Sequence, residues 1–264
     1  MCPPKPRIRR KCEPLQRQEA LSGHTVPADL LLGAREVHEA LCAPALRRIG
    51  NFDIACATVP AQHVSSDFVT MFEHNGCWFL AMGDLMGKGL SAAMWLTHVL
   101  DLLHRACETG DALPAIMQSL NCEVHRSRVG VPLTSLFLAR LDPATSTVTY
   151  SCGGCPPAFL LTGGQTFTRL ESGGPILGAK ERATYSSSAV VLGLQDTLLV
   201  TSDGVIEVHQ GTTFEWRPDR VARHLKFSAG DSAGSLVQSL AARVKTASPA
   251  ISHDLSLMAV QRVA

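Results

Sequence analysis

Four aspartates are the residues of this sequence with the clearest capacity for chemistry, because each lies where an apolar segment meets a loop. Asp67 and Asp254 each precede such a segment, whereas Asp84 and Asp203 each follow one. A strand holds a side chain at its end rigidly, and the glycines next to Asp84 and Asp203 let backbone or ligand approach closely. Carboxylates gathered at one rim repel one another unless a cation lies among them, and oxygen ligands suit Mg²⁺ or Mn²⁺.

A turn is the simpler explanation for any one of these aspartates, since Asp beside Gly favours tight turns. The metal-site interpretation depends on all four sharing the same arrangement. The segment G-D-L-M-G-K-G at 83–89 does not fit a nucleotide-binding loop, because only three residues separate Gly83 from Gly87 where that loop has four. No H-E-x-x-H motif is present, which disfavours a zinc protease.

The composition is that of a folded globular protein, with 45% hydrophobic and 18% charged residues in a chain of 264. A formal net charge of +1 argues against a nucleic-acid-binding protein that works by bulk electrostatics. No apolar run is long enough for a membrane-spanning helix, and the polar N-terminus lacks the apolar region of a secretory signal. The nine irregularly spaced cysteines are typical of a reducing compartment. These features predict a cytoplasmic protein without a nucleic-acid partner.

Cys152 and Cys155 form the C-x-x-C pair of the sequence. A structural zinc site needs a second pair of ligands at suitable spacing, and the other cysteines do not supply one. We therefore interpret this pair as two thiols in a turn, in preference to a zinc site or a redox centre.

The chain divides into a tail and one domain. Residues 1–28 are polar and carry a cluster of basic residues, which predicts a flexible basic tail. Residues 29–264 form the predicted single domain. It begins with a helix at 29–48, where apolar residues recur at helical spacing and Pro44 ends or kinks the helix.

Short segments rich in Val, Leu, Phe and Thr follow between turn residues, and they predict strands. These strands are expected at 52–59, 67–73, 77–83, 134–141, 146–152, 157–162, 188–193, 196–202 and 255–261. Helices are expected at 90–107, 111–127, 218–227 and 232–246. This order lacks a βαβ alternation and predicts an α+β fold with mostly antiparallel sheets.

Four motifs occur in the order V-S-S-D (64–67), G-D-L-M-G-K-G-L-S-A-A (83–93), T-S-D-G-V-I-E (201–207) and H-D-L-S-L-M (253–258). Together they resemble the SpoIIE-type serine/threonine phosphatases, the bacterial sigma-regulatory branch of the protein phosphatase 2C-like, metal-dependent phosphatases. The resemblance covers about residues 35–262. It implies a four-layer α-β-β-α sandwich, in which two antiparallel sheets are flanked by helices.

The resemblance also implies a mechanism, in which two Mn²⁺ or Mg²⁺ ions share a water that attacks phosphorus in line. Carried over by position, Asp84 and Asp203 are the catalytic aspartates. Asp84 bridges both ions, the Leu85 carbonyl completes one site and Asp203 holds the second ion. Asp67 binds metal directly or through water, and the last motif supplies its ligand from the pair 253–254.

Departures from the family pattern bear on this metal site. The first Asp is often preceded by Gly-Gly and followed three residues later by a second acid, but here Ser65-Ser66 and Thr70 stand at those positions. The last motif often reads Asp-Asp, and here it is His253-Asp254. Neutral imidazole binds Mn²⁺ but removes a negative charge, so the second site is expected to be weak and to favour Mn²⁺ over Mg²⁺.

Two functions follow from the resemblance. The first is hydrolysis of a phosphoserine or phosphothreonine on a protein, of which the usual family example is a STAS-type anti-sigma-factor antagonist. The second is a phosphatase fold with a weakened metal site that regulates a partner by docking. The resemblance gives Gly87, Lys88 and Gly89 a regulatory role, since helix movements beside the metal site control metal binding in related phosphatases. Two modes of control are compatible with the sequence: an activating partner that docks on the helix at 29–48, or constitutive activity.

Overall fold

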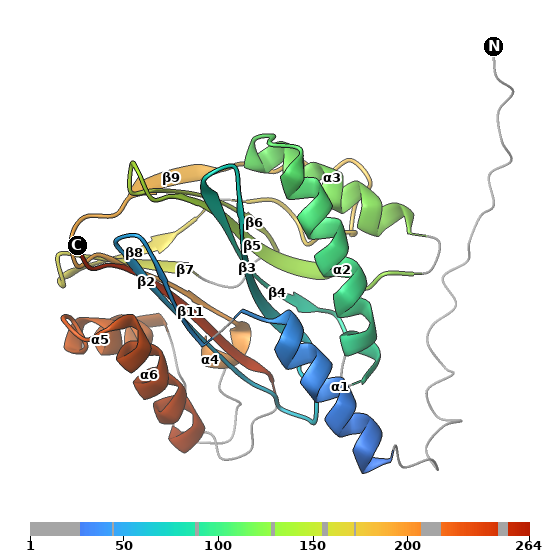
Figure 1. Cartoon of the computed structure of the whole chain (residues 1–264), viewed down its shortest axis with the longest axis horizontal. Coiled ribbons are helices and arrows are strands. Elements are labelled where there is room, and N and C mark those ends of the chain that lie inside the picture. Colours follow the sequence, from blue (N-terminus) through green and yellow to red (C-terminus); the bar gives the residue numbers. More distant parts are fainter. Residues whose placement is uncertain are drawn as a thin grey trace, which may run out of the picture.

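The computed structural model of the protein describes residues 27–43, 45–87, 90–127, 130–154, 158–171, 173–206, 218–247 and 253–264. Within these ranges the chain forms two sheets that pack face to face, with helices against the outer face of each sheet (Figure 1). All neighbouring strands in both sheets are antiparallel. The predicted four-layer α-β-β-α sandwich of the α+β class is confirmed.

The first sheet joins strands from both ends of the domain. Its order is β1 (Leu46–Ile49), β2 (Phe52–Val59), β11 (Leu255–Arg262), β10 (Thr197–Thr201), β7 (Ala158–Thr162) and β8 (Thr166–Leu170). The second sheet comes from the middle of the chain. Its order is β3 (Asp67–His74), β4 (Cys77–Leu85), β5 (Thr134–Asp142), β6 (Thr147–Gly153) and β9 (Ser188–Val191).

The helices form the two outer layers. α2 (Leu90–Glu108) and α3 (Leu113–Arg126) cover the second sheet, and α1 (Ala28–Leu41) lies beside α2 (Figure 1). α5 (Pro218–Phe227) and α6 (Ala233–Ala247) cover the first sheet, and the short α4 (Asp203–Ile206) follows β10. None of the helices in the described ranges combines the length and the hydrophobicity needed to span a bilayer.

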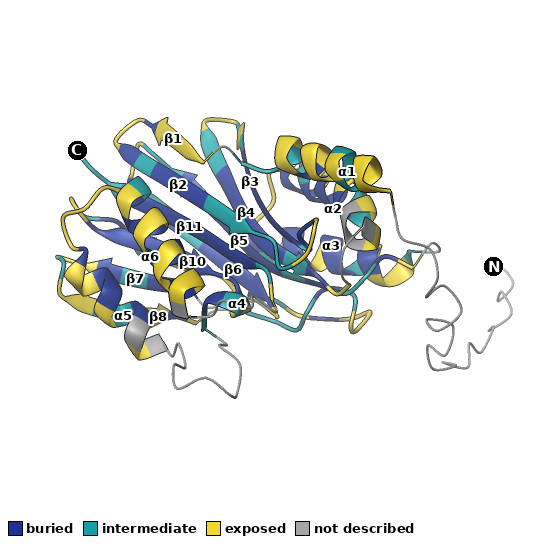
Figure 2. Cartoon of the chain, turned by 90° about the horizontal axis from the view of Figure 1, so that it is seen from below, coloured by how far each residue is buried: buried dark blue, intermediate teal, exposed yellow. Residues whose placement is uncertain are grey.

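Side-chain alternation along β3 and β4 decides which face of the second sheet each residue occupies. Val69 and Met82 belong to the core between the two sheets, whereas Phe68 and Ala81 belong to the core under α2 and α3. Asp67 has the parity of Val69, and Asp84 has the parity of Met82. Both aspartates therefore lie on the inter-sheet face, at the end of the buried strands that Figure 2 shows between the exposed outer surfaces of the helices.

One predicted helix ends earlier in the structure, and three short elements were not predicted. The helix expected at 29–48 ends at Leu41, because Cys42 is already extended (φ −85°, ψ 160°) and residues 46–49 form β1 against β2. Pairing with β2 outweighs the helical spacing, and the proline that follows Ala43 in the sequence disfavours a helical conformation for that residue. Sequence patterning also missed β8 and α4, which are short.

The interpretation of Cys152 as a free thiol is wrong. Cys152 lies on β6, buried in the inter-sheet core, and it is disulfide-bonded. Hydrophobic patterning carries no information on the redox state of a cysteine, which is why the prediction failed. Cys155 lies outside the described residues. Five other cysteines in the described part of the chain, Cys42, Cys56, Cys77, Cys107 and Cys122, are free thiols.

The inter-sheet core predicts a sharp contrast between two phenylalanines. Phe137 is fully buried between the sheets, whereas Phe227 is 87% exposed at the end of α5. We expect Phe137→Ala to lower the free energy of unfolding by about 3–5 kcal/mol, because it removes packing and leaves a cavity. Phe227→Ala makes the same change on the surface and should alter the free energy of unfolding by no more than about 0.5 kcal/mol. Urea denaturation of both variants checks this, and equal midpoints would contradict the described core.

Candidate metal centre

The register of β3 and β4 places two predicted ligands opposite each other, since Asp67 pairs with Asp84. The Leu85 amide donates to the Ser66 carbonyl (3.2 Å), so these two residues form a hydrogen-bonded pair. The next pair, Asp67 and Asp84, is then a non-hydrogen-bonded pair, in which opposed side chains approach most closely. The strand pairing therefore brings two carboxylates together on the inter-sheet face.

Each of these carboxylates keeps one buried oxygen without a hydrogen-bond partner, Oδ2 of Asp67 and Oδ1 of Asp84. Asp67 is only 3% exposed, so bulk water does not compensate its free oxygen. An unsatisfied buried charge is costly unless a cation or a proton neutralises it. Two such oxygens on opposed side chains are a donor set that fits a hard divalent cation.

Burial and nearby negative charges raise the pKa of both groups. Burial, together with the nearby charges of Asp84 and Asp254, raises the pKa of Asp67 to about 8, although hydrogen bonding with the Ser256 and Ser202 side chains opposes this rise. Burial is also the main cause that raises the pKa of Asp84. In the absence of metal, a proton takes the place of the cation on this pair.

The first sheet brings the other predicted ligands to the same rim. Asp203 begins α4 directly after β10, and Asp254 directly precedes β11. The charges of Asp254 and Asp203 both contribute to the raised pKa of Asp84, while His253 opposes that rise. These three residues thus lie within electrostatic range of Asp84, and the four aspartates gather where the ends of the two sheets meet.

Asp254 is engaged differently from the other aspartates. Its Oδ1 accepts a hydrogen bond from the Ala61 amide (2.7 Å), and its Oδ2 accepts from the amide (2.6 Å) and the hydroxyl (2.9 Å) of Ser66. This carboxylate therefore ties the start of β11 to both ends of the loop that leads into Asp67. Asp254 acts here as an anchor for the segment that carries Asp67.

Serines complete this framework, and sequence reasoning gave them no role. Ser65 Oγ accepts from the Asp67 amide (3.0 Å), so the Ser-Ser pair that replaces Gly-Gly supplies hydrogen bonds before the first aspartate. Ser202 Oγ donates to the Asp254 carbonyl (3.1 Å) and accepts from the Ser256 amide (2.9 Å). The signal available in the sequence was the position of these serines, each within two residues of a candidate ligand.

The glycines beside the aspartates permit close backbone approach, as expected. A Cβ on Gly83 would collide with the Ser135 carbonyl of β5 and the Phe68 ring. A Cβ on Gly204 would collide with the Asp254 carbonyl and lie 3.3 Å from the His253 Cβ. Both glycines therefore let neighbouring strands close around the rim.

The remaining predicted residues take the following positions. Leu85 ends β4 next to Asp84 and is buried, whereas His253 and Gly87 are exposed. Lys88 and Gly89 lie outside the described residues, so the structure assigns them no role. Thr70 has the parity of Phe68 and is buried on the helix-facing side of β3. An acid at that position would point away from Asp67, so Thr70 removes no ligand from the inter-sheet face.

In the described part of the chain, no three His, Cys, Asp or Glu side chains form a ready-made cage for one ion. This openness is compatible with Mg²⁺-type coordination, which generally uses one or two protein carboxylates and retains several waters. The rim thus presents a few carboxylates to an ion from one side.

A stretch G-D-S-A-G at 230–234 matches the pattern of a hydrolase nucleophile elbow, but its surroundings do not. Such an elbow follows a strand, whereas this stretch joins α5 to α6. Ser232 Oγ accepts from the Ser235 amide (3.2 Å) and so caps α6. The serine has a structural role at a helix start.

Comparison with known proteins identifies related sequences and folds. A family profile for stage II sporulation protein E (SpoIIE) matches residues 74–263. The chain is similar to the phosphoserine phosphatase RsbU of Bacillus subtilis (strain 168), with 25% identity over 233 residues, which span 87% of this chain and 69% of that protein.

Solved structures share the fold at lower identity. The SiaA-PP2C domain of Pseudomonas aeruginosa superposes with a TM-score of 0.75 at 15% identity, covering 88% of this chain and 96% of that one. The structure of the PP2C phosphatase domain and a fragment of the regulatory domain of SpoIIE from Bacillus subtilis gives a TM-score of 0.69 at 18% identity, covering 82% and 63%. These likenesses establish the sandwich fold.

The raised pKa of Asp67 predicts how stability depends on pH without metal. The folded state binds this proton more tightly than the unfolded chain, so the resulting stabilisation is complete below the ordinary pKa of 3.8 and is lost as pH rises through about 8. In EDTA, the urea midpoint of the wild type should therefore fall between about pH 5.5 and about pH 8.5. Asp67→Asn should flatten this decline and raise the midpoint at the alkaline end.

Asp111→Asn is the matched control, because Asp111 is exposed in the loop between α2 and α3. This variant should retain the pH dependence of the wild type. If the urea midpoint of Asp67→Asn fell with pH as steeply as that of the wild type, ionisation of Asp67 would not be the cause of the decline.

Proposed function

Because this chain belongs to the stage II sporulation protein E (SpoIIE) family, we propose that it is a metal-dependent serine/threonine phosphatase that hydrolyses a phosphoprotein. The similarity to the phosphoserine phosphatase RsbU supports the reaction. One observation carries the metal dependence: Asp67 and Asp84 are opposed in register, and each has a buried oxygen without a hydrogen-bond partner.

The metal ligands that we propose come from both sheets. Asp67 and Asp84 contribute from the second sheet, together with the Leu85 carbonyl, and Asp203 contributes from the end of β10. The similar proteins and the oxygen-rich donor set support Mn²⁺ or Mg²⁺, with two ions as the family pattern implies. When bound, such ions activate water and offset charge on a phosphoryl group.

The role of Asp254 is proposed to differ from that of a ligand. Three donors already occupy its two oxygens, so its main task is to hold the loop before Asp67 in place. His253 is then the residue of the last motif that faces the metals. Its imidazole supplies a neutral ligand where the family pattern has a carboxylate, which supports a weak second site and a preference for Mn²⁺.

The substrate and partners extend the proposal. We place a phosphorylated serine or threonine of a STAS-type anti-sigma-factor antagonist at the acidic rim, in line with the sigma-regulatory branch to which the motifs point. An activating partner that docks on α1 is the proposed source of control. The outward side chains of α1 include three exposed apolar residues, Leu30, Leu32 and Val37, which such a partner could cover.

A docking module with a weakened metal site is the second candidate. His253 favours it, because the imidazole lowers the negative charge of the site. Thr70 does not, because its side chain faces away from the rim. The buried and unpartnered oxygens of Asp67 and Asp84 favour the enzyme, because a docking surface gains nothing from an uncompensated pair of opposed carboxylates.

The phosphatase proposal predicts a selective loss of activity in Asp84→Asn. This change keeps the size of the side chain and removes the charge that the metals require. We expect Mn²⁺-dependent hydrolysis of p-nitrophenyl phosphate and of a phosphoserine protein to fall at least about a hundredfold, the scale on which one electrostatic contribution to a transition state acts. The variant should remain folded, as judged by circular dichroism.

Asp101→Asn provides the control, because Asp101 is exposed on α2 and contacts only the neighbouring helix turn through Arg105 (3.1 Å) in the described structure. It should retain wild-type activity. Full activity in Asp84→Asn would contradict the assigned site. A folded wild type without Mn²⁺-dependent hydrolysis would favour the docking module instead.

A further inference from the structure

β3 is an edge strand of its sheet, so alternate carbonyls along it face away from β4 and need partners elsewhere. In the hydrogen-bonding pattern with β4, the carbonyls of Asp67 and Val69 are among those that face away. One accepts from His38 of α1, and the other from Ala43, two residues after the end of α1. The Ala43 amide donates to the Val69 carbonyl (2.7 Å), and His38 Nε2 lies 2.9 Å from the Asp67 carbonyl.

His38 is distinctive within its helix. All residues of α1 are described, and His38 alone among them is buried, with 6% of its surface exposed. A buried imidazole commonly packs as part of an apolar core, yet the side chain of His38 ends on the backbone of a candidate metal ligand. The helix therefore reaches the metal centre through one side chain.

The chemistry of this contact fixes the protonation of the ring. A carbonyl oxygen only accepts hydrogen bonds, so Nε2 of His38 must carry the proton. Cys42 Sγ lies 3.8 Å from Nδ1 and 3.9 Å from Nε2 of the same ring, so it packs beside the imidazole without selecting one nitrogen. The contact between Nε2 and the Asp67 carbonyl is therefore the hydrogen bond that orients the ring.

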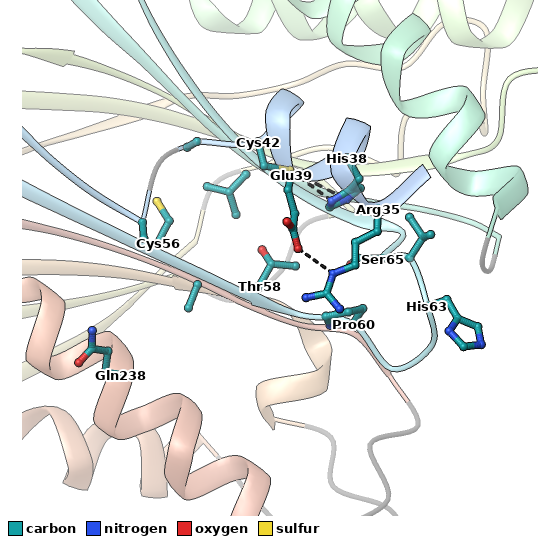
Figure 3. Close-up of a pocket in the computed structure, with 15 residues that line it drawn as sticks. Arg35, His38, Glu39, Cys42, Cys56, Thr58, Pro60, His63, Ser65 and Gln238 are labelled. Carbon is teal, nitrogen blue, oxygen red and sulfur yellow. Dashed lines mark hydrogen bonds and ion pairs between the residues drawn. The ribbon is translucent and has the colours of Figure 1, made fainter. Parts of the chain in front are cut away.

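α1 packs against α2 on one side, and a cavity borders it on another. A cavity of about 520 Å³ opens between α1, β2, the loop before β3 and α6 (Figure 3). His38 of α1 and Cys42, which directly follows α1, line it, and Cys56 and Thr58 of β2 and Ser65 of the loop before β3 line it as well. Because side chains do not fill this space, α1 has no continuous apolar contact with β2, and the hydrogen bond from His38 to the edge of β3 matters more on that side.

We propose that His38 is a positioning residue, which fixes the Asp67 peptide so that the Asp67 carboxylate is held ready for metal. The inference rests on the proposed function, because it requires Asp67 to bind the metal. The Asp67 amide is already fixed by Ser65 Oγ (3.0 Å), and His38 fixes the carbonyl of the same residue. With both backbone groups held, the side chain has only its own torsions left to adjust.

Loss of the His38 donor would leave the Asp67 carbonyl buried and unsatisfied. The peptide would then turn towards another donor and carry the carboxylate away from Asp84. The affinity of the metal centre is therefore set in part by this one hydrogen bond from His38.

Mn²⁺ titration by calorimetry on the full chain tests the inference without reference to a substrate. We expect His38→Leu, which fills the space without a donor, to weaken Mn²⁺ binding about tenfold, equivalent to ~1.4 kcal/mol. His38→Gln has an amide that reaches the carbonyl and should stay within about threefold of the wild type. If His38→Leu fails to fold, His38→Asn takes its place, because its shorter amide cannot reach the carbonyl.

His224→Leu is the matched control. His224 is about as buried as His38 (7% exposed), and its Nε2 forms a hydrogen bond with Ser239 Oγ (3.0 Å) in the opposite outer layer. His224→Leu should lower the free energy of unfolding without changing Mn²⁺ affinity. The comparison therefore separates an effect of His38 on the Asp67 peptide from general destabilisation.

The outcomes are distinguishable. Weakened binding in His38→Leu with recovery in His38→Gln supports the inference. Wild-type affinity in His38→Leu, or an equal loss in His224→Leu, overturns it and leaves the proposed function intact. A wild type that binds no Mn²⁺ overturns the proposed metal centre and the inference with it.

Discussion

The carboxylates of Asp67 and Asp84 face each other across neighbouring strands, and each keeps a buried oxygen that nothing in the described structure satisfies. Desolvation and the charges of neighbouring aspartates raise the pKa of both groups. Either a proton or a divalent cation relieves this cost, and only the cation leaves both groups ionised. The surrounding framework is best understood as the structure that keeps these two charges close together.

That framework draws on parts of the chain that are far apart in sequence. Asp254 comes from the start of the last strand, yet it binds the loop that precedes the first of the two carboxylates. Gly204 lets the turn after β10 lie directly against the Asp254 backbone. His38 reaches the same peptide from α1. The geometry of the rim therefore depends on both sheets and an outer helix being in place.

The sequence was sufficient to predict much of this arrangement, because the strands are strongly apolar and the aspartates stand at their ends. It could not predict β1, whose Leu46–Ile49 segment continues a helical spacing and becomes a strand only through pairing with β2. Nor could it separate Asp254 from the other aspartates, because the three donors that occupy its oxygens lie nearly 190 residues away or more. His38 was also invisible, since an isolated histidine on a helix gives no sign that it ends on an edge-strand carbonyl.

Anomalous diffraction from crystals grown with MnCl₂ tests the central claim most directly, because it locates the ion without assuming a substrate. The account predicts a manganese peak in ligating contact with Asp84 Oδ1 and adjacent to Asp67 Oδ2, and the loss of that peak in Asp84→Asn crystals. Manganese bound only at other surface carboxylates, with the two opposed oxygens left without an ion, would contradict it.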